Sequence, residues 1–274
     1  LILNCSAVGG NTPAGIRMSQ RNRSVGGTVA GQLHRRREKM NATDILRHID
    51  HTQLKATASW DDIQKLCEEA IQYGTASVCI PPCYVKRVRE RFGRKPVICT
   101  VIGFPLGYAT TGTKLAETRE ALENGADEFD MVINLSDVKN GMFDRVEEEI
   151  RALKEAVGEH ILKVIVETCC LTEEEKIRLC GCVTRAGADY IKTSTGFGAK
   201  GAELSDILLF RSHIGEGVKI KAAGGIRSVE DMEAFLEAGA DRLGTSSGIA
   251  VLRSAGRMEP LQNTEDAAER RNFR

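Results

Sequence analysis

Short apolar runs alternate with amphipathic stretches along most of the chain, from about residue 41 to about residue 252. Each apolar run has the length of a strand, and each amphipathic stretch repeats its apolar positions with the spacing of one helix face. The pattern therefore predicts eight strands, each followed by a helix. The predicted strands cover residues 46–50, 76–80, 96–102, 128–133, 162–167, 189–193, 218–222 and 241–245.

The helical stretches carry recognisable start signals. Ser59 is placed as an N-cap, and the residues after it put Ile63 and Leu66 on one apolar face. A capping box joins an N-cap hydroxyl to an acidic residue three positions later, so that each side chain bonds the other residue's backbone N–H. Capping boxes are predicted at Thr172 with Glu175 and at Ser228 with Asp231.

A glycine-containing turn recurs where a predicted helix gives way to a predicted strand. Glycine favours this position because it adopts the left-handed conformation that closes a helix. Each interval between these glycines is long enough for two strand–helix units. The turn is found in "YGTASVCI", "NGADEFDMVIN", "AGADYIKTS" and "AGADRLGTS", at Gly74, Gly125, Gly187 and Gly239.

Alternation of strands and helices predicts an α/β fold with a parallel sheet, and eight units predict a single-domain (β/α)₈ TIM barrel over residues 41–252. A doubly wound open sheet is the alternative, but no G-x-G-x-x-G turn follows the first strand. Residues 1–40 hold seven basic residues against one acid and are expected to be a disordered extension, either a transit peptide or a non-native addition. Residues 253–274 are predicted to form a polar tail outside the core.

The composition narrows the functional classes. A formal net charge of zero argues against nucleic-acid binding, which normally needs a basic excess. No apolar run is long enough to span a bilayer, so no membrane association is expected. The nine cysteines contain no Cys-x-x-Cys pair, and several lie in apolar runs. They are interpreted as buried free thiols in a reducing compartment, and the predicted location is the cytoplasm.

Polar and charged residues occur at the carboxyl ends of several predicted strands, where the reaction site of a TIM barrel lies. Any one of them has a structural explanation: a strand lysine at a surface, a solvated acidic turn around Asp130, or a Lys163–Glu167 ion pair. The strands of a barrel are buried on both faces, so these residues cannot all be surface or solvated residues at once. The residues concerned are Asp50, Thr52, Asp130, Asn134, Lys163, Glu167, Lys192 and Lys221.

Two of these lysines, Lys192 and Lys221, end neighbouring predicted strands. A lysine nucleophile has to be neutral, so its pKa must fall from about 10.4 to about 7, which costs roughly 4.6 kcal/mol. A second ammonium about 4 Å away supplies about 1 kcal/mol in water but about 4 kcal/mol at an effective dielectric constant of 20. A shielded lysine pair therefore indicates a Schiff-base nucleophile beside a second cation.

The loops after the last two predicted strands have the features of a phosphate site. Barrels of this type commonly bind phosphate there, with backbone N–H groups and helix N-termini. Tight strand–helix turns are the structural alternative. The loop at 195–201, with Lys200 as an uncertain contributor, is expected to close over the same group. The predicted phosphate-binding residues are Gly196, Gly224, Gly225, Arg227, Ser246 and Ser247.

The motifs "DHTQLK", "EFDMVIN", "KVIVET", "IKTSTGFG", "KAAGGIR" and "GTSSG" together resemble those of the deoxyribose-phosphate aldolase family, over residues 41–252. The resemblance implies a class I aldolase without metal or cofactor that reversibly cleaves 2-deoxy-D-ribose 5-phosphate to D-glyceraldehyde 3-phosphate and acetaldehyde, in deoxyribose phosphate catabolism. It implies small phosphosugar and aldehyde substrates. Whether identical chains assemble into a dimer or a tetramer is left open by the sequence.

The same resemblance assigns roles. It implies that Lys192 forms the Schiff base, that Lys221 is the neighbouring cation that helps to move protons, and that Asp130 acts as acid and base with water. Asp50 and Thr52 match positions that line the substrate and the proton network. Lys163 also matches a family position, and it is predicted to bind substrate.

Two rival functions stay open from the sequence. A metal-dependent aldolase or isomerase would need a histidine cluster, and of five histidines only His48 and His51 lie near a predicted strand end. A phosphosugar-binding barrel without catalytic activity would form no covalent adduct with its ligand.

Overall fold

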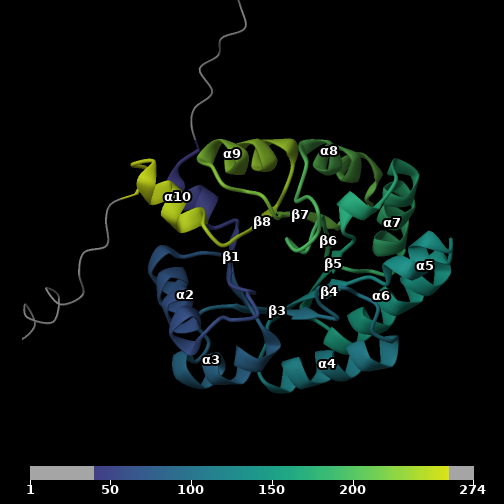
Figure 1. Ribbon diagram of the computed structural model, residues 1–274, viewed down its shortest axis with the longest axis horizontal. Coiled ribbons are helices and arrows are strands. Elements are labelled where there is room, and N and C mark those ends of the chain that lie inside the picture. Colours follow the sequence, from purple (N-terminus) through teal and green to yellow (C-terminus); the bar gives the residue numbers. More distant parts are fainter. Residues whose placement is uncertain (1–39, 259–274) are drawn as a thin grey trace, which may run out of the picture. The chain divides into compact units, whose positions relative to one another are not determined.

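The computed structural model describes residues 40–258, and their strands form one closed parallel barrel in the order β1 to β8. Figure 1 shows the helices arranged in a ring around the strands. The predicted TIM barrel is therefore confirmed, and the open doubly wound sheet is excluded. The strands are β1 (Ile49–Thr52), β2 (Ser77–Ile80), β3 (Ile98–Ile102), β4 (Glu128–Val132), β5 (Ile161–Ile165), β6 (Tyr190–Lys192), β7 (Lys219–Ala223) and β8 (Arg242–Thr245).

All eight predicted strands are present, and the first is the one most displaced. Residues predicted to begin that strand instead end a short helix, whose N-cap Asn41 accepts a hydrogen bond from the backbone N–H of Asp44. An asparagine cap stabilises a helix start, which explains why the strand begins only at Ile49. This displacement leaves the charged strand ends in place.

The helices surround the barrel, and β4 is followed by two of them. The capping boxes predicted at Thr172 and Ser228 have the expected reciprocal bonds, and the predicted N-cap Ser59 also forms a capping box, with Asp62. The helices are α1 (Ala42–Leu46), α2 (Trp60–Tyr73), α3 (Val85–Phe92), α4 (Thr111–Glu123), α5 (Leu135–Lys139), α6 (Phe143–Val157), α7 (Glu173–Arg185), α8 (Leu204–His213), α9 (Val229–Ala238) and α10 (Gly248–Ser254), with 3-10 turns η1 (Pro82–Tyr84) and η2 (Thr168–Cys170).

The recurring glycines take the predicted left-handed conformation. Gly74 has φ of 68° and Gly239 has φ of 111°, and each closes the helix before it. Gly125 and Gly187 also have positive φ, of 95° and 76°. The repeated phrase in the sequence is therefore a repeated turn between a helix and the next barrel strand.

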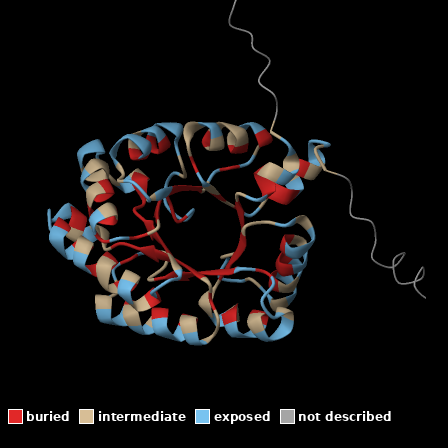
Figure 2. Cartoon of the chain, turned by 180° about the vertical axis from the view of Figure 1, so that it is seen from behind, coloured by how far each residue is buried: buried red, intermediate tan, exposed pale blue. Residues whose placement is uncertain are grey.

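The strands bury both of their faces, as Figure 2 shows by the continuous red ring of the barrel. Residues facing outward are apolar and pack against the helices; examples are Phe129, Val164 and Ile220. Residues facing the lumen are mostly polar or charged, apart from a small cluster of Cys79, Cys99 and Val101. The main hydrophobic core therefore lies between strands and helices, and the lumen carries the charges.

The described chain extends slightly beyond both predicted barrel boundaries. Helix α10 runs through the predicted boundary at residue 253, and Arg257 donates hydrogen bonds to Glu233, at 2.9 Å, and to the backbone oxygen of Met40. The other residues of the predicted extension and tail lie outside the described part of the chain. Within the described part, no helix is both long and apolar enough to cross a membrane.

Candidate active site

Three lysines meet one carboxylate in the barrel lumen. Lys192 Nζ and Lys221 Nζ both donate to Asp130 Oδ2, at 2.8 and 2.6 Å, and Lys163 Nζ donates to Asp130 Oδ1 at 2.8 Å. The nitrogens of Lys192 and Lys221 therefore lie no further apart than the sum of their two distances to the shared oxygen. The predicted lysine pair is present, with an anion between its members.

Strand register explains why these side chains meet. Lys192 of β6 lies opposite Lys221 of β7, and Asp130 of β4 lies opposite Lys163 of β5. Side chains directly opposite each other on neighbouring strands point to the same face, which here is the lumen. The lysines are buried, and burial of an ammonium is tolerated only when anions and hydrogen bonds compensate its lost hydration.

A second layer of ion pairs lies around Asp130. Asp50 contacts Lys221 and Arg242, each at 2.5 Å, and Glu128 contacts Lys163 at 2.7 Å and Arg242 at 3.3 Å. We call the seven connected residues the lumen cluster. Four of them are cationic when fully protonated, and three are carboxylates. The members are Asp50, Glu128, Asp130, Lys163, Lys192, Lys221 and Arg242.

These contacts fix the ionisation of most of the lumen cluster. Burial opposes the charge of Asp130, but the three neighbouring lysines outweigh it and hold the pKa of Asp130 well below its usual value. Burial also opposes the charges of Lys163 and Lys221, yet the surrounding carboxylates raise the pKa of both lysines. Asp130 is therefore an anion, and Lys163 and Lys221 are cations, throughout the physiological range.

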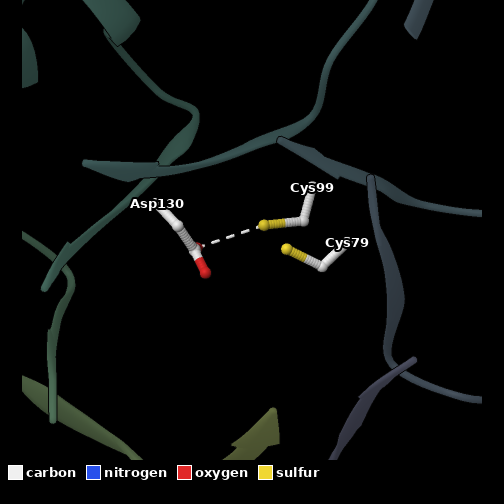
Figure 3. A group of neighbouring side chains, drawn as sticks. All are labelled: Cys79, Cys99 and Asp130. Carbon is white, nitrogen blue, oxygen red and sulfur yellow. Dashed lines mark hydrogen bonds between the residues drawn. The ribbon is translucent and has the colours of Figure 1, made fainter. Parts of the chain in front are cut away.

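Two cysteine thiols from neighbouring strands lie beside Asp130 in the lumen (Figure 3). Cys99 donates to Asp130 Oδ1 at 3.1 Å and accepts a hydrogen bond from Lys163 Nζ at 3.2 Å. Burial is the main reason that the pKa of the Cys99 thiol lies well above its usual value. Cys99 is thus a protonated thiol that takes part in the charged hydrogen-bond network of the lumen.

Two groups of donor atoms among the described residues have the spacing that a metal ion needs, and both include Cys99. The carboxylates of both groups are already bonded by lysine ammonium groups, at 2.5 to 2.8 Å, so a metal would have to displace or face those cations. Neither group contains a histidine. His48 bonds the backbone of Asp241 and His51 bonds Glu69, so the predicted histidines do not join the lumen cluster.

A cavity of about 320 Å³ opens at the carboxyl ends of the strands, beside the lumen cluster. Lys192 is the cluster member that reaches this cavity, with 3 % of its surface exposed, whereas Lys163 and Lys221 have none. The cavity is lined by Thr52, Gln53, Leu54, Lys55, Lys192, Thr195, Gly196, Phe197, Ala223, Gly224, Gly225, Ile226, Arg227, Gly244, Thr245, Ser246 and Ser247.

Backbone contacts bring the loops after β6 and β7 together at one side of the cavity. The N–H of Ala202 donates to the carbonyl oxygens of Ala223, at 3.0 Å, and Gly224, at 3.1 Å. Gly224 has φ of 80°, and a Cβ built on Gly201 would lie only 2.2 Å from its oxygen. The loop at 195–201 therefore packs against the turn after β7, and this close approach requires glycine at these positions.

The cavity also has an aromatic wall and a positive side. Phe197 packs edge-on against Phe104, with ring centroids 5.3 Å apart. Arg227 is exposed, lines the cavity and precedes Ser228, the N-cap of α9. Lys55, which the sequence analysis did not select, lines the same cavity. Cations and a helix N-terminus make this side suited to an anion.

The predicted site residues fall into two groups. Thr52, Gly196, Gly224, Gly225, Arg227, Ser246 and Ser247 line the cavity together with Lys192. Asp50 and Lys163, predicted to bind substrate, do not: both are fully buried in the lumen cluster, where they pair with other charges. Their predicted contact with substrate stays a prediction, and in the structure both residues are counter-charges within the lumen cluster.

Other predictions around the site are also corrected. Glu167 does not pair with Lys163; it accepts hydrogen bonds from the backbone N–H and hydroxyl of Thr195. Asn134, predicted at the end of the fourth strand, is the N-cap of α5, and its side chain accepts a hydrogen bond from the backbone N–H of Ser136. Lys200 is an exposed residue that pairs with Glu203 at 3.1 Å and does not line the cavity.

The sequence analysis missed Glu128, Arg242 and Cys99. Glu128 and Arg242 begin their strands, at the barrel end opposite the one searched for reactive groups, and their long side chains reach the lumen cluster. The signal for them was the alternation itself, because Glu128 and Asp130 share one face of β4. Cys99 was grouped with inert thiols because no spacing pattern distinguished it.

Comparisons with known proteins identify the family. The family model described as DeoC/LacD family aldolase matches residues 45–255. The chain is 63 % identical to the deoxyribose-phosphate aldolase of Clostridium botulinum (strain Alaska E43 / Type E3) over 214 residues, which is 78 % of this chain and 97 % of that protein. Identity to the deoxyribose-phosphate aldolase of Clostridioides difficile (strain 630) is 58 % over 210 residues, covering 77 % and 96 % of the two chains.

A solved structure gives the same result. The deoxyribose phosphate aldolase from Aeropyrum pernix, described as having a unique tetrameric structure, superposes with a TM-score of 0.71 and 35 % identity, over 79 % of this chain and 92 % of that one. The matched region includes the whole barrel and its lumen cluster. The chain therefore belongs to the DeoC/LacD family of aldolases.

Proposed function

We propose that this protein is a deoxyribose-phosphate aldolase that reversibly cleaves 2-deoxy-D-ribose 5-phosphate to D-glyceraldehyde 3-phosphate and acetaldehyde, in deoxyribose phosphate catabolism. The reaction proceeds through a Schiff base on Lys192. One observation carries this proposal. Lys192 and Lys221 share a single carboxylate oxygen, but only Lys192 also faces the cavity. One amine is thereby presented to substrate, and the other is held beside it.

The charge balance of the lumen cluster supports Lys192 as the neutral amine. With every group ionised, four cations face three anions in a shielded space. Release of one proton balances the cluster, and like charges held close in a low dielectric strongly favour that release. The carboxylates hold the protons of Lys163 and Lys221, and Lys192 is the one lysine of the three that faces the cavity. Asp130 therefore positions the two lysines and limits their repulsion.

The chemistry follows from this arrangement. The neutral amine of Lys192 adds to the aldehyde carbon of the open-chain sugar, and loss of water leaves a protonated imine. The substrate hydroxyl at C3 then loses its proton, the C2–C3 bond breaks, and its electron pair forms an enamine as glyceraldehyde phosphate leaves. Protonation of the enamine carbon and hydrolysis of the imine release acetaldehyde and restore the amine.

Two groups of the lumen cluster manage the protons. Asp130 stays ionised, so it acts through water as the acceptor in each transfer. Lys221 stays a buried ammonium bonded to the same oxygen as Lys192, so it assists proton movement as a fixed positive charge beside the reacting amine. Thr52, whose hydroxyl donates to the backbone oxygen of Asp50 at 2.7 Å, orients the sugar at the cavity wall.

The substrate phosphate binds at the positive side of the cavity. Arg227 supplies a guanidinium, and the loops after β6, β7 and β8 supply backbone N–H groups and hydroxyls. This side lies across the same cavity as Lys192, so a phosphosugar reaches the amine with one end and the anion site with the other. The phosphate contacts are assigned to Gly196, Gly224, Gly225, Arg227, Ser246 and Ser247.

Assembly and surroundings form part of the proposal. A homo-oligomer of the kind described for the Aeropyrum pernix relative is proposed for this chain. Free buried thiols such as Cys67 and Cys180 favour a reducing compartment, and the cytoplasm stays the predicted location. The Schiff-base route needs no metal or cofactor, because the imine itself withdraws the electrons.

A turnover assay tests the proposed function. Purified protein is incubated with 2-deoxyribose 5-phosphate, and acetaldehyde and glyceraldehyde 3-phosphate are measured with and without EDTA. The proposal predicts equal amounts of both products at a rate that the chelator leaves unchanged. Absence of cleavage contradicts the proposal, and loss of activity in EDTA that zinc restores favours a metal-dependent enzyme.

A further inference from the structure

Two adjacent cysteines lie outside the lumen cluster, at the turn that follows β5. Cys169 and Cys170 belong to the 3-10 turn η2, and their Sγ atoms are 4.0 Å apart. Cys170 is exposed and Cys169 is half-buried. The two thiols are thus presented together at the surface, at a separation that a single atom bonded to both sulfurs can close with small rotations.

This dithiol is tied to the loop that lines the active-site cavity. Glu167, just before η2, has a left-handed φ of 55° and accepts hydrogen bonds from Thr195. The N–H of Thr168 donates to the backbone oxygen of Thr193 at 2.9 Å. A Cβ built on Gly198 would lie 3.0 Å from Cys169 Sγ, so the thiol packs directly against this loop. A group attached to Cys169 therefore lies in contact with this loop.

A second, smaller cavity gives the attached group room. It has a volume of about 190 Å³ and is separate from the active-site cavity. Cys169 forms part of its wall, with the loop at Lys200 and Gly201 on one side and α8 on another. Its lining residues are Thr168, Cys169, Leu171, Lys176, Lys200, Gly201, Glu203 and Asp206.

The thiols favour one class of ligand. Burial and the neighbouring Cys169 raise the pKa of the Cys170 thiol, so little thiolate is present at neutral pH and simple alkylation is slow. Soft, polarisable atoms prefer sulfur as their ligand. Such an atom binds more tightly when it can bond two sulfurs that the protein already holds close together. A centre that carries a basic oxygen can also take up both thiol protons.

We propose that Cys169 and Cys170 form a dithiol site for organic trivalent arsenicals, and that occupation of this site inhibits the enzyme through the loop at 195–201. Two S–H bonds and the arsenic–oxygen double bond of an arsine oxide break, and two As–S bonds form. The two thiol protons leave with the oxygen as water. Arsenic stays trivalent, so no oxidant or reductant is required.

Phenylarsine oxide is the probe that tests this proposal. The full chain is treated with about one equivalent and digested, and the peptides are mapped by mass spectrometry while activity is followed. We expect one arsenic bridging Cys169 and Cys170 and a loss of activity of about tenfold, because a small displacement of a positioning loop has effects of this size or larger. The dithiol 2,3-dimercaptopropanol should restore activity, and equimolar monothiol should not.

Matched serine variants separate this site from the other cysteines. Cys170→Ser removes one sulfur from an exposed position that does not line the active-site cavity, so it should keep basal activity and lose the inhibition. Cys83→Ser removes a different exposed cysteine and should stay fully sensitive. Three results each overturn the proposal: undiminished inhibition of Cys170→Ser, an adduct on Cys79 and Cys99, or a bridged Cys169–Cys170 pair in a fully active enzyme.

Discussion

The lumen cluster and the loops at the cavity rim are built in opposite ways. The lumen cluster consists of charged side chains carried by strands, fully or almost fully buried apart from Arg242 and bonded to one another at 2.5 to 3.7 Å. The rim consists of glycines, small hydroxyl residues and exposed cations on loops. The proposed chemistry thus lies on the strands, and the proposed substrate recognition lies on the loops.

This difference predicts how substitutions act in each region. Members of the lumen cluster share partners, so removal of one changes the charge of the others and the effects do not add. Rim residues contact substrate from separate loops, so their effects on binding should be closer to additive. The following variants break or sharpen this contrast, from the largest expected effect to the smallest.

Lys192→Met should have the largest effect on turnover. It removes the one cluster amine that faces the cavity, and loss of a covalent nucleophile lowers kcat by about 10⁴-fold or more. The methionine lacks a charge and is accommodated among six remaining groups of balanced charge, so the fold should persist. Steady-state kinetics measure kcat, and circular dichroism tests whether the fold persists. The control is Lys219→Met, which changes an exposed lysine on β7. Activity within about tenfold of wild type would disprove the role of Lys192.

Lys221→Met should alter the pH dependence of the reaction. Without Lys221 the lumen cluster balances with Lys192 protonated, so the neutral amine is reached only at higher pH. The acid limb of the pH profile of kcat/KM should move to alkaline pH by about one to two units, because two close charges interact by a few kcal/mol at an effective dielectric constant near 20.

The matched control for this pH profile is again Lys219→Met, two residues away on the same strand and exposed. Its acid limb should coincide with that of the wild type. If the acid limb of Lys221→Met also stays in place, the charge-balance account of the lumen cluster is wrong. This holds even if the variant is slower than the wild type.

Arg227→Ala tests the rim. Loss of a charge-assisted contact to phosphate costs about 1.5–3 kcal/mol, so KM for the phosphorylated sugar should rise by about 10- to 100-fold with a small change in kcat. Cleavage of unphosphorylated 2-deoxyribose should be unaffected by the substitution. Equal losses for both sugars would place Arg227 outside the phosphate site.

Cys99→Ala should have the smallest effect of the four. It removes a hydrogen bond to Asp130 and one from Lys163, with a cost in unfolding free energy of about 1–3 kcal/mol. Cys67→Ala is the control, because Cys67 is equally buried but lies in the apolar core of α2. Chemical denaturation compares the two, and kcat should fall only for Cys99→Ala. An unchanged kcat would reduce Cys99 to a packing residue.

The sequence predicts much of the lumen cluster and less of the rim. Lys192 and Lys221 were predictable because strand period and barrel topology leave a strand-end lysine few places to point. Asp130 was ambiguous, since it follows Asp127 and Glu128; in the structure Asp127 alone fits the acidic-turn reading, pairing with Arg89 at 2.6 Å near the surface.

The remaining features depend on distances that no local pattern encodes. The sequence indicates two lysines side by side but not the carboxylate oxygen that they share, nor the contact of Arg242 on β8 with Glu128 on β4 across the lumen. The packing of Gly201 against Gly224 joins loops separated by a whole helix, so neither loop predicts it alone. Strand period and barrel topology predict the direction in which a side chain points. Which side chains contact one another depends on the three-dimensional arrangement of the whole barrel.

Borohydride trapping tests the central claim most directly. The protein is reduced with borohydride in the presence of acetaldehyde or 2-deoxyribose 5-phosphate, and the modified peptide is identified by mass spectrometry. The account predicts a single reduced adduct on Lys192 that Lys219→Met retains and Lys192→Met lacks. An adduct on Lys221 or Lys163, or no adduct in a protein that still turns over substrate, would contradict it.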